Sequence, residues 1–353
     1  MTIQTAKMHS RTPVHWPWIA AVAILGASTV CIAGLCAAEP ATEAKRPVAT
    51  GAFVQLSRRT ANGAAWWYAE LEAMKRQGMD TVIVAAVANG RKYYYPTRIP
   101  GSRRLEIDLV ESVISAADRH GLKVYLGLHL DREQFDAGKF DVPSNLAQAQ
   151  VELDELRARY GGHASLAGWY MPQEVSDYMV FHQPQLRDDV VAYTKAIVQK
   201  AHASGGLPVM MSPFFGQKCD AAAYAKWWDE TGLPRTGIDV VALQDGVGTR
   251  RTTAADAVAV FKALQPVMAK HRVAFWANNE SFYQIHGWPV DDQPWAAEPT
   301  KAETFVAQIE STLPFVEKSI TFEFCTYLSP QGSAAAQRLH REYQAHIDNH
   351  LDQ

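Results

Sequence analysis

The chain has 353 residues and a formal net charge of −3 at pH 7. Hydrophobic residues make up 48% of it and charged residues 20%, so the chain can bury a large core. This composition excludes a disordered chain, a collagen-like repeat and a polytopic membrane protein. A sequence pI of about 6.5 is too low for the basic surface that is typical of nucleic-acid-binding proteins, so we expect no nucleic-acid partner.

The N-terminal segment has the pattern of an export signal. Lys7 and Arg11 precede an apolar run over residues 16–38, and no Asp, Glu, Lys or Arg lies between Arg11 and Glu39. Small residues end the run, as in a signal peptide. The run is also long enough to span a bilayer, so a cleaved signal peptide and an uncleaved anchor both remain open.

This pattern predicts the organisation of the whole chain. Residues 1–38 are expected to be a signal peptide or membrane anchor, residues 39–48 a polar linker, and residues 49–353 one folded domain. Basic residues before an apolar run stay inside, so the folded domain is predicted to be exported. We expect it in the periplasm, either soluble or associated with the inner membrane through residues 16–38.

Cysteine is sparse in the sequence. Cys31 and Cys36 lie in the N-terminal apolar run, which leaves Cys219 and Cys325 for the folded domain. One disulfide is possible, but we expect two unpaired thiols. No Cys-x-x-Cys or other metal-ligand spacing is present, so neither a metal site nor a cofactor is predicted.

The body of the chain alternates between short apolar runs and amphipathic helical patterns. The predicted strands, in chain order, are residues 50–56, 81–87, 123–128, 166–171, 208–212, 237–243, 272–277 and 319–324. The predicted helices that follow them are residues 64–77, 107–120, 146–160, 186–204, 221–230, 253–270, 301–316 and 334–349.

Eight strand–helix units predict an α/β fold of the (β/α)8 TIM-barrel type. The strands begin about 38 residues apart on average, close to the size of one barrel unit. Apolar strands separated by helices indicate a parallel sheet covered on both faces. The first strand is not followed by Gly-x-Gly-x-x-Gly, and no segment remains for a second domain, so a barrel is favoured over a doubly wound sheet.

Two glutamates stand at predicted strand ends, where a TIM barrel has its active site. Glu174 closes the fourth strand in LAGWYMPQE, and Glu280 closes the seventh in VAFWANNE. Glycoside hydrolysis requires two carboxyl groups that face one glycosidic bond. The fourth and seventh strands are three apart around an eight-stranded ring, so their ends can face each other. We therefore predict Glu174 and Glu280 as the catalytic residues.

The spacing and local sequence of these glutamates resemble a large group of retaining glycosidases, whose catalytic glutamates follow strands four and seven. The resemblance implies that Glu174 is the acid/base and Glu280 the nucleophile. The chain departs from that group at one position, because Gln173 stands where many members have Asn. A glutamine can still donate a hydrogen bond to a sugar 2-hydroxyl, although its reach differs.

Residues 49–345 also resemble a bacterial family of glycosidase-type barrels that is classified as a domain of unknown function. The resemblance rests on GAFVQL at the first strand, GWYMPQE at the fourth, ALQDGVG at the sixth and the glutamate after the seventh. It implies the fold and the class of enzyme, and it implies no particular substrate.

Other residues near the strand ends are candidates for binding sugar through hydrogen bonds or ring stacking. Asp245 could instead hold a turn before Gly246, and the run Tyr93–Tyr95 could instead pack beneath a loop. The predicted substrate-binding residues are Gln173, Asp245, Gln244, Asn279, Tyr170, Tyr94, His129 and Tyr327.

Two orientations stay open from the sequence. Trp276 and Asn278 share one face of the seventh strand, and Ala277 and Asn279 share the other, but the pattern does not decide which face points into the barrel. Glu323, within the eighth strand, is expected either to point into the barrel mouth or to pair with a buried base.

These observations predict a retaining glycoside hydrolase or transglycosylase, without a cofactor, that acts on an exported or cell-envelope polysaccharide. One alternative is an inverting glycosidase that uses Glu174 and Asp245, which would need a wider gap between the carboxyl groups to hold a water. The other is a non-catalytic polysaccharide-binding subunit of an envelope assembly, which the anchor-like N-terminus and Gln173 favour. The oligomeric state stays open.

Overall fold

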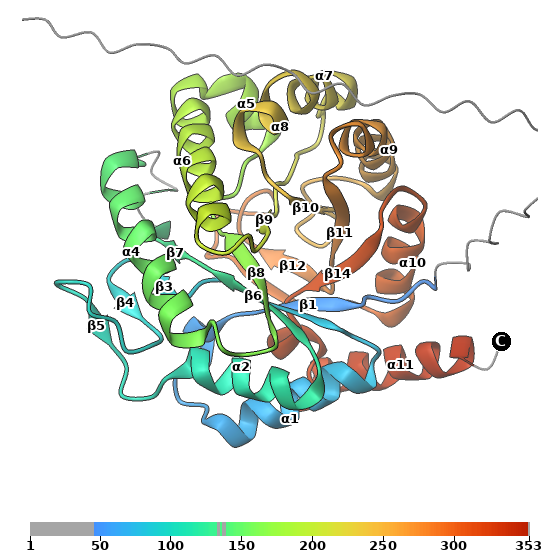
Figure 1. Cartoon of the computed structure of the whole chain (residues 1–353). Helices are drawn as coiled ribbons and strands as arrows, with labels where there is room; N and C mark the ends of the chain where they lie inside the picture. The colour runs from blue at the N-terminus through green and yellow to red at the C-terminus, as the bar shows by residue number, and fades with distance from the viewer. Residues whose placement is uncertain (1–45, 133–134, 136–138, 352–353) are drawn as a thin grey trace, which may run out of the picture. The chain divides into compact units, whose positions relative to one another are not determined.

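Eight parallel strands close into a barrel at the centre of the structure, a computed structural model that describes residues 46–132, 135 and 139–351 (Figure 1). Around the ring the strands run in the order β1, β14, β11, β10, β9, β8, β6 and β2. Their bounds are β1 Gly51–Val54, β2 Thr81–Val84, β6 Lys123–Gly127, β8 Leu166–Met171, β9 Val209–Met211, β10 Val240–Gln244, β11 Ala274–Glu280 and β14 Lys318–Phe322. The predicted TIM barrel is confirmed. The predicted signal or anchor lies outside the described residues.

Helices surround the ring of strands (Figure 1). The long ones are α1 Ala64–Arg76, α2 Leu109–His120, α4 Val142–Tyr160, α6 Pro184–Ala203, α9 Ala254–His271, α10 Ala302–Thr312 and α11 Ala334–Leu351. The predicted helix 221–230 is instead α7 Ala221–Trp227, which continues through a π-helical turn into α8 Leu233–Thr236. No helix within the described residues is both long and apolar enough to cross a membrane.

Short side chains and aromatic rings share the interior of the barrel. Phe53, Tyr125 and Tyr170 fill it together with aliphatic residues from other strands. A Cβ at Gly168 would lie 2.4 Å from the Tyr125 ring, so a glycine is needed there to admit that ring. On β11, Trp276 packs into this inner cluster, which settles the open question of which face of the strand points inward.

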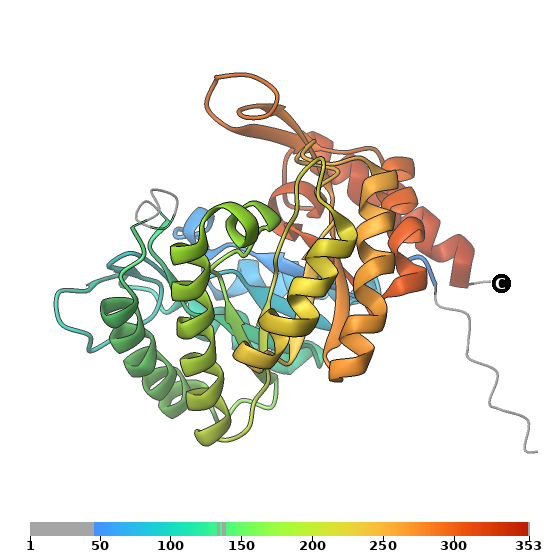
Figure 2. The same cartoon turned by 90° about the horizontal axis from the view of Figure 1, so that it is seen from above.

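Additional elements cover the carboxyl ends of the strands. β3 (Ala88–Asn89), β4 (Lys92–Tyr93), β5 (Arg103–Arg104) and β7 (His129–Leu130) form a small four-stranded sheet beyond β2 and β6. β12 (Phe282–His286) and β13 (Ala296–Pro299) form an antiparallel hairpin directly after β11. The loop of this hairpin projects from the body of the domain and is the orange loop at the top of Figure 2. These elements build the walls of the barrel mouth.

Candidate active site

A cavity of about 550 Å³ opens at the carboxyl ends of the barrel strands. Glu174, which follows β8, and Glu280, the last residue of β11, both line it. Of the predicted substrate-binding residues, Tyr170, Tyr94 and Gln244 also line it. The structure therefore brings the two predicted catalytic carboxyl groups into one cavity with three of the predicted contacts.

Glu174 is held from two sides but remains accessible. Its side chain is 32% exposed, and a guanidinium nitrogen of Arg132 lies 3.9 Å from Oε2. Gln244 donates a hydrogen bond from Nε2 to Oε1 of Glu174 at 3.1 Å and another to the Ser212 carbonyl at 2.8 Å. The second bond fixes the amide of Gln244, so this residue orients the Glu174 carboxylate.

Glu280 is buried, with 2% of the residue exposed. The backbone N–H of Thr249 donates a hydrogen bond to Oε2 at 2.7 Å. A Cβ at Gly248 would lie 2.7 Å from Cβ of Glu280 and 2.4 Å from the Phe282 carbonyl, so only glycine allows this backbone to approach. Burial, followed by the neighbouring Asp245 carboxylate, raises the pKa of Glu280 to about 8.

Asp245 lies behind Glu280 and does not line the cavity. It is 1% exposed, and its Oδ2 accepts hydrogen bonds from Asn279 at 2.9 Å and from Gln308 of α10 at 3.0 Å. Burial raises the pKa of Asp245, and these amide donors oppose that effect. Three hydrogen bonds to Asp245, counting the one from the Val247 N–H, favour its charged form over that of Glu280.

This placement corrects two predicted sugar contacts. Asp245 and Asn279 face outward from the barrel wall, and Asn279 is fully buried against Thr312 of α10 and Ser319 of β14. The residue of β11 that reaches the cavity is Asn278. Its Nδ2 donates to Ser212 Oγ at 3.2 Å, and its buried Oδ1 accepts no hydrogen bond within the described part of the chain.

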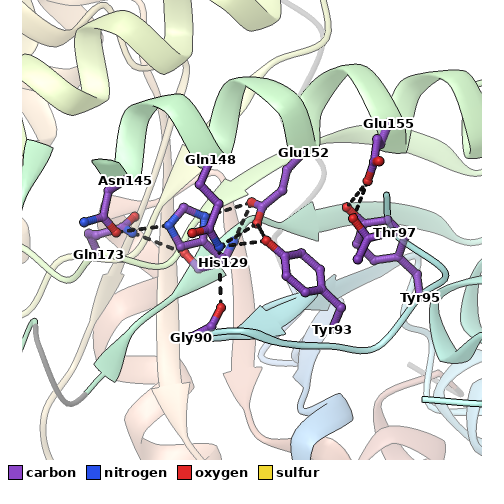
Figure 3. A network of polar contacts seen from close by, with 10 residues as sticks. All are labelled: Gly90, Tyr93, Tyr95, Thr97, His129, Asn145, Gln148, Glu152, Glu155 and Gln173. Carbon is purple, nitrogen blue, oxygen red and sulfur yellow. Dashed lines mark hydrogen bonds and ion pairs between the residues drawn. The ribbon is translucent and has the colours of Figure 1, made fainter. Parts of the chain in front are cut away.

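His129 and Gln173, also predicted as sugar contacts, belong to a buried polar network beneath α4 (Figure 3). Nδ1 of His129 lies 2.9 Å from Glu152 Oε2, and Nε2 lies 3.0 Å from Asn145 Oδ1. Nε2 of Gln173 donates to the His129 carbonyl at 3.3 Å. Both residues are 1% exposed and neither lines the cavity, so the prediction of direct sugar contact is corrected.

The His129 ring is placed to carry a positive charge. Asn145 donates from Nδ2 to the Asp141 carbonyl, which leaves Oδ1 as the acceptor for His129 Nε2. Since the Glu152 carboxylate also accepts, both ring nitrogens act as donors. Burial lowers the pKa of His129, but the Glu152 charge and these hydrogen bonds outweigh it and raise that pKa above its ordinary value.

The remaining aromatic candidates divide between the cavity and its surroundings. Tyr327 does not line the cavity; its ring packs 5.0 Å from that of Phe282, which does. Tyr327 lines a neighbouring hollow of about 680 Å³ together with Trp66. Tyr93 and Tyr95 are fully buried, which agrees with the alternative that these tyrosines pack beneath a loop.

Glu323 takes neither of its two expected places. It is fully buried and accepts hydrogen bonds from the Gln55 N–H at 3.3 Å and the Thr326 N–H at 3.1 Å. It thereby caps the π-helical turn Phe324–Leu328 and contributes no carboxylate to the cavity lining.

Three cationic residues of the cavity are not among the residues predicted from the sequence. Arg58 follows β1, Arg132 follows β7, and Arg251 lies in the loop after β10, and all three line the cavity. Position at a strand end was a usable signal for Arg58. No such signal exists for Arg251, because six residues of loop separate it from the end of β10 at Gln244.

Neither cysteine of the folded domain is paired. Cys219 and Cys325 are free thiols in the structure. Within the described ranges, no group of three or more His, Cys, Asp or Glu side chains is placed to hold a metal ion.

Comparisons with known proteins agree with the fold. The family model "Domain of unknown function (DUF4434)" matches residues 49–334. No curated protein matches the chain significantly. Among solved structures, a proposed alpha-L-fucosidase from Bacteroides thetaiotaomicron is similar with a TM-score of 0.71 and 24% identity, covering 85% of this chain and 95% of that one.

Two further solved structures are similar at lower identity. A beta-glucosidase from Thermotoga maritima has a TM-score of 0.54 at 7% identity, covering 86% of this chain and 98% of that one. A GH18 chitinase from Pseudoalteromonas aurantia has a TM-score of 0.52 at 12% identity, covering 85% and 99%. At these identities the likeness establishes the barrel fold and does not assign an activity.

Proposed function

This chain belongs to the DUF4434 family, and we propose that it is a glycoside hydrolase or transglycosylase that acts through Glu174 and Glu280. The observation that carries the proposal is that both carboxyl groups line one cavity at the active-site end of a TIM barrel. The rings of Tyr170 and Phe282 line the same cavity and offer faces for sugar stacking. The glycosidase names of structurally similar proteins support the same class.

In the retaining mechanism that we propose, Glu280 attacks the anomeric carbon while Glu174 protonates the leaving oxygen. Glu174 then takes a proton from water, or from an acceptor sugar in a transglycosylase, and the glycosyl–Glu280 bond is broken. The Thr249 N–H fixes one oxygen of Glu280, and Gln244 fixes one oxygen of Glu174. Both carboxyl groups are therefore oriented before a substrate arrives.

The predicted export segment supports an exported or cell-envelope polysaccharide as the substrate. We propose a periplasmic location, soluble or associated with the inner membrane through residues 16–38. An inverting mechanism with Asp245 is disfavoured, because Asp245 is buried behind the barrel wall and hydrogen-bonded to Asn279 and Gln308.

The test is an assay of envelope polysaccharides with the wild type, Glu174→Gln and Glu280→Gln, with the sugar anomer followed by NMR. We expect each variant to lose roughly 10²–10⁴-fold in turnover and the wild-type product to keep the anomeric configuration of the substrate. Glu298→Gln is the matched control, since Glu298 is an exposed carboxylate of β13 outside the cavity. Full activity in either catalytic variant, or an inverted product, would contradict the assignment.

A second candidate is polysaccharide binding without turnover. Two observations favour it. Gln173 hydrogen-bonds the backbone of His129 instead of reaching the cavity. Burial and the Asp245 charge raise the pKa of Glu280, which disfavours the ionised form that a nucleophile needs. Titration with oligosaccharides separates the candidates. Saturable binding without any product after prolonged incubation would support the binding protein and contradict the enzyme.

A further inference from the structure

The charged lining of the cavity is unbalanced. Five charged side chains line it, the arginines Arg58, Arg132 and Arg251 and the glutamates Glu174 and Glu280. Arg132 and Glu174 face each other at 3.9 Å. Burial and Asp245 raise the pKa of Glu280, and Arg251 lies close enough to that carboxyl for its charge to oppose the rise. The lining therefore has three guanidinium groups against two carboxyl groups, so one cation is in excess even when both glutamates are ionised.

Arg251 is fixed in place without using its hydrogen-bond donors on the protein. Its guanidinium lies 5.2 Å from the ring centre of Phe214 and 5.3 Å from that of Trp288. Its Nε is buried and has no hydrogen-bond partner in the described part of the chain, and the carboxylate that it influences is Glu280, where its charge opposes the rise in pKa. A guanidinium that packs its faces on aromatic rings keeps its in-plane N–H groups available for a bidentate contact with an anion.

Arg58 provides a second cation at the opposite part of the mouth. It ends the short turn η1 (Leu56–Arg58) after β1 and is exposed. Burial raises the pKa of Glu323 and the charge of Arg58 opposes that rise, but this carboxylate is fully buried and does not line the cavity. Three steps around the barrel ring separate β1 from β10, which carries the loop of Arg251. The two cations therefore reach the cavity from well-separated strands, as contacts to different parts of one ligand would require.

We propose that this cavity recognises an acidic glycan and that Arg58 and Arg251 bind its anionic groups. The group that they would bind is a carboxylate or sulfate on a sugar, since the planar guanidinium can donate two parallel hydrogen bonds to two oxygens of such a group. The apolar faces of the same sugars would pack on the aromatic side chains of the cavity. This inference rests on the proposed function, because it takes the cavity to be a glycan-binding site.

The experiment is a calorimetric titration of the full chain with oligogalacturonate, oligomannuronate and sulfated oligosaccharides, each beside its carboxyl-reduced or desulfated counterpart. We expect at least one acidic probe to bind ten-fold or more tightly than its neutral counterpart, and added salt to weaken that binding. Because carboxylated and sulfated probes are titrated separately, the experiment also shows which of the two anionic groups the cavity prefers. Equal affinity for charged and neutral probes, or no binding of any acidic probe, would overturn the proposal.

Variants assign the effect to the two arginines. Arg251→Gln and Arg58→Gln should each weaken binding of the acidic probe about ten-fold, or about 1.4 kcal/mol, and leave the neutral probe unchanged. Arg250→Gln is the matched control, because Arg250 packs on Tyr283 and does not line the cavity. If Arg251→Gln does not fold, Arg251→Lys keeps the charge, loses the fork and should give an intermediate affinity. Equal effects of the Arg250 and Arg251 variants would refute the assignment.

The outcomes separate this inference from the proposed enzyme. Tight binding of an acidic glycan without cleavage would contradict the hydrolase and leave the arginine assignment standing. Cleavage of a neutral glycan by the wild type with a kcat/KM equal to that for its acidic counterpart would leave the hydrolase standing and overturn the acidic substrate.

Discussion

Glu280 combines deep burial with a neighbouring carboxylate, and both effects raise its pKa, to about 8. Only an ionised carboxylate can attack the anomeric carbon, so kcat/KM should rise as the pH is increased through this pKa. If Glu280 were instead the acid, kcat/KM would fall over the same range. A pH profile of kcat/KM between pH 5 and pH 10 therefore tests the role of Glu280 directly.

Asp245→Asn should move that profile to lower pH. The substitution removes the negative charge beside Glu280, so the pKa of Glu280 falls, while continued burial keeps it above its ordinary value of 4.5. Asp229→Asn, which alters a half-buried carboxylate paired with Lys270 and His271 outside the cavity lining, is the control and should leave the profile unchanged. An unmoved profile in Asp245→Asn would show that the two carboxyl groups are not coupled.

Gly248 is the residue whose absence of a side chain admits the Thr249 N–H to Glu280. Gly248→Ala would place a methyl group against Glu280 and the Phe282 carbonyl, and we expect a loss of roughly 1–3 kcal/mol in the free energy of unfolding. Gly216→Ala is the matched loop control, because a Cβ there meets no atom within 4 Å, and should change stability by less than about 0.5 kcal/mol. Urea unfolding of both variants measures the difference.

The candidate site could be predicted from the sequence only in part. Position at a strand end located Glu174, Glu280, Gln244 and Tyr170, because the barrel brings those ends together. The sequence does not tell which side of the strand end a side chain takes. Asp245, Asn279, Gln173 and His129 therefore had the right position along the chain but point away from the cavity.

At the scale of elements, the polar network under α4 ties that helix to β7 and to the segment before Glu174 (Figure 3). Glu152→Gln should lower the free energy of unfolding by about 1–3 kcal/mol, because it weakens the buried charged pair with His129. The raised pKa of His129 gives the loss a pH dependence. The stabilisation by this pair is fully present below the ordinary histidine pKa of 6.5 and is lost as the pH rises through the pKa of the folded state.

The stability difference between wild type and Glu152→Gln should therefore be larger at pH 6 than at pH 9, as measured by urea unfolding at both values. Glu155→Gln is the control from the next turn of α4. Glu155 accepts hydrogen bonds from Thr97 at 2.6 Å and from the Arg98 N–H at 2.8 Å and has no contact with His129. Its effect should be the same at both pH values; parallel curves for the two variants would contradict a charged His129.

Elements with regular periodicity could be predicted from the sequence, and short ones could not. All eight barrel strands lie where apolar runs predicted them, and β8 has the predicted bounds, Leu166–Met171. The strands β3, β4, β5 and β7 have two residues each, too few for an alternating pattern to show. β12 begins two residues after the end of β11, and the polar residues 278–281 at this junction indicate the end of a strand, so the sequence gives no sign that an extended chain continues.

At the scale of the whole molecule, the residues that stabilise the closed barrel are different from the residues that line the candidate site. The eight strands pair in a complete ring, so no barrel strand has a free edge. The inner aromatic cluster of Phe53, Tyr125 and Tyr170 closes the interior beneath the cavity. Catalytic and binding side chains stand at strand ends and in loops, where substitutions leave the ring intact.

The ring depends on β1, which is the first element of the described chain. β1 pairs with β2 on one side and with β14 on the other. Just before it, the Ala49 N–H donates to the Tyr343 hydroxyl of α11 at 2.7 Å, and the Thr50 N–H donates to the Ser319 carbonyl at 2.8 Å. Within the described residues, the hydrogen bonds at Ala49 and Thr50 and the packing of Val48 against the core therefore link the start of the first strand to the last helix and to β14.

A chain that begins at residue 46 should therefore fold with the melting temperature of the full chain, while one that begins at residue 55 should not fold. The shorter chain lacks β1 and leaves the edges of β2 and β14 unpaired, with the apolar interior of the barrel open to water. Calorimetry and near-UV circular dichroism of the two chains provide the measurement. Tyr343→Phe in the longer chain is the control for a small perturbation. It removes one hydrogen bond and should lower the free energy of unfolding by only about 1–3 kcal/mol. A cooperative melting transition in the chain from residue 55 would mean that the barrel is held by its helices and that ring closure is dispensable.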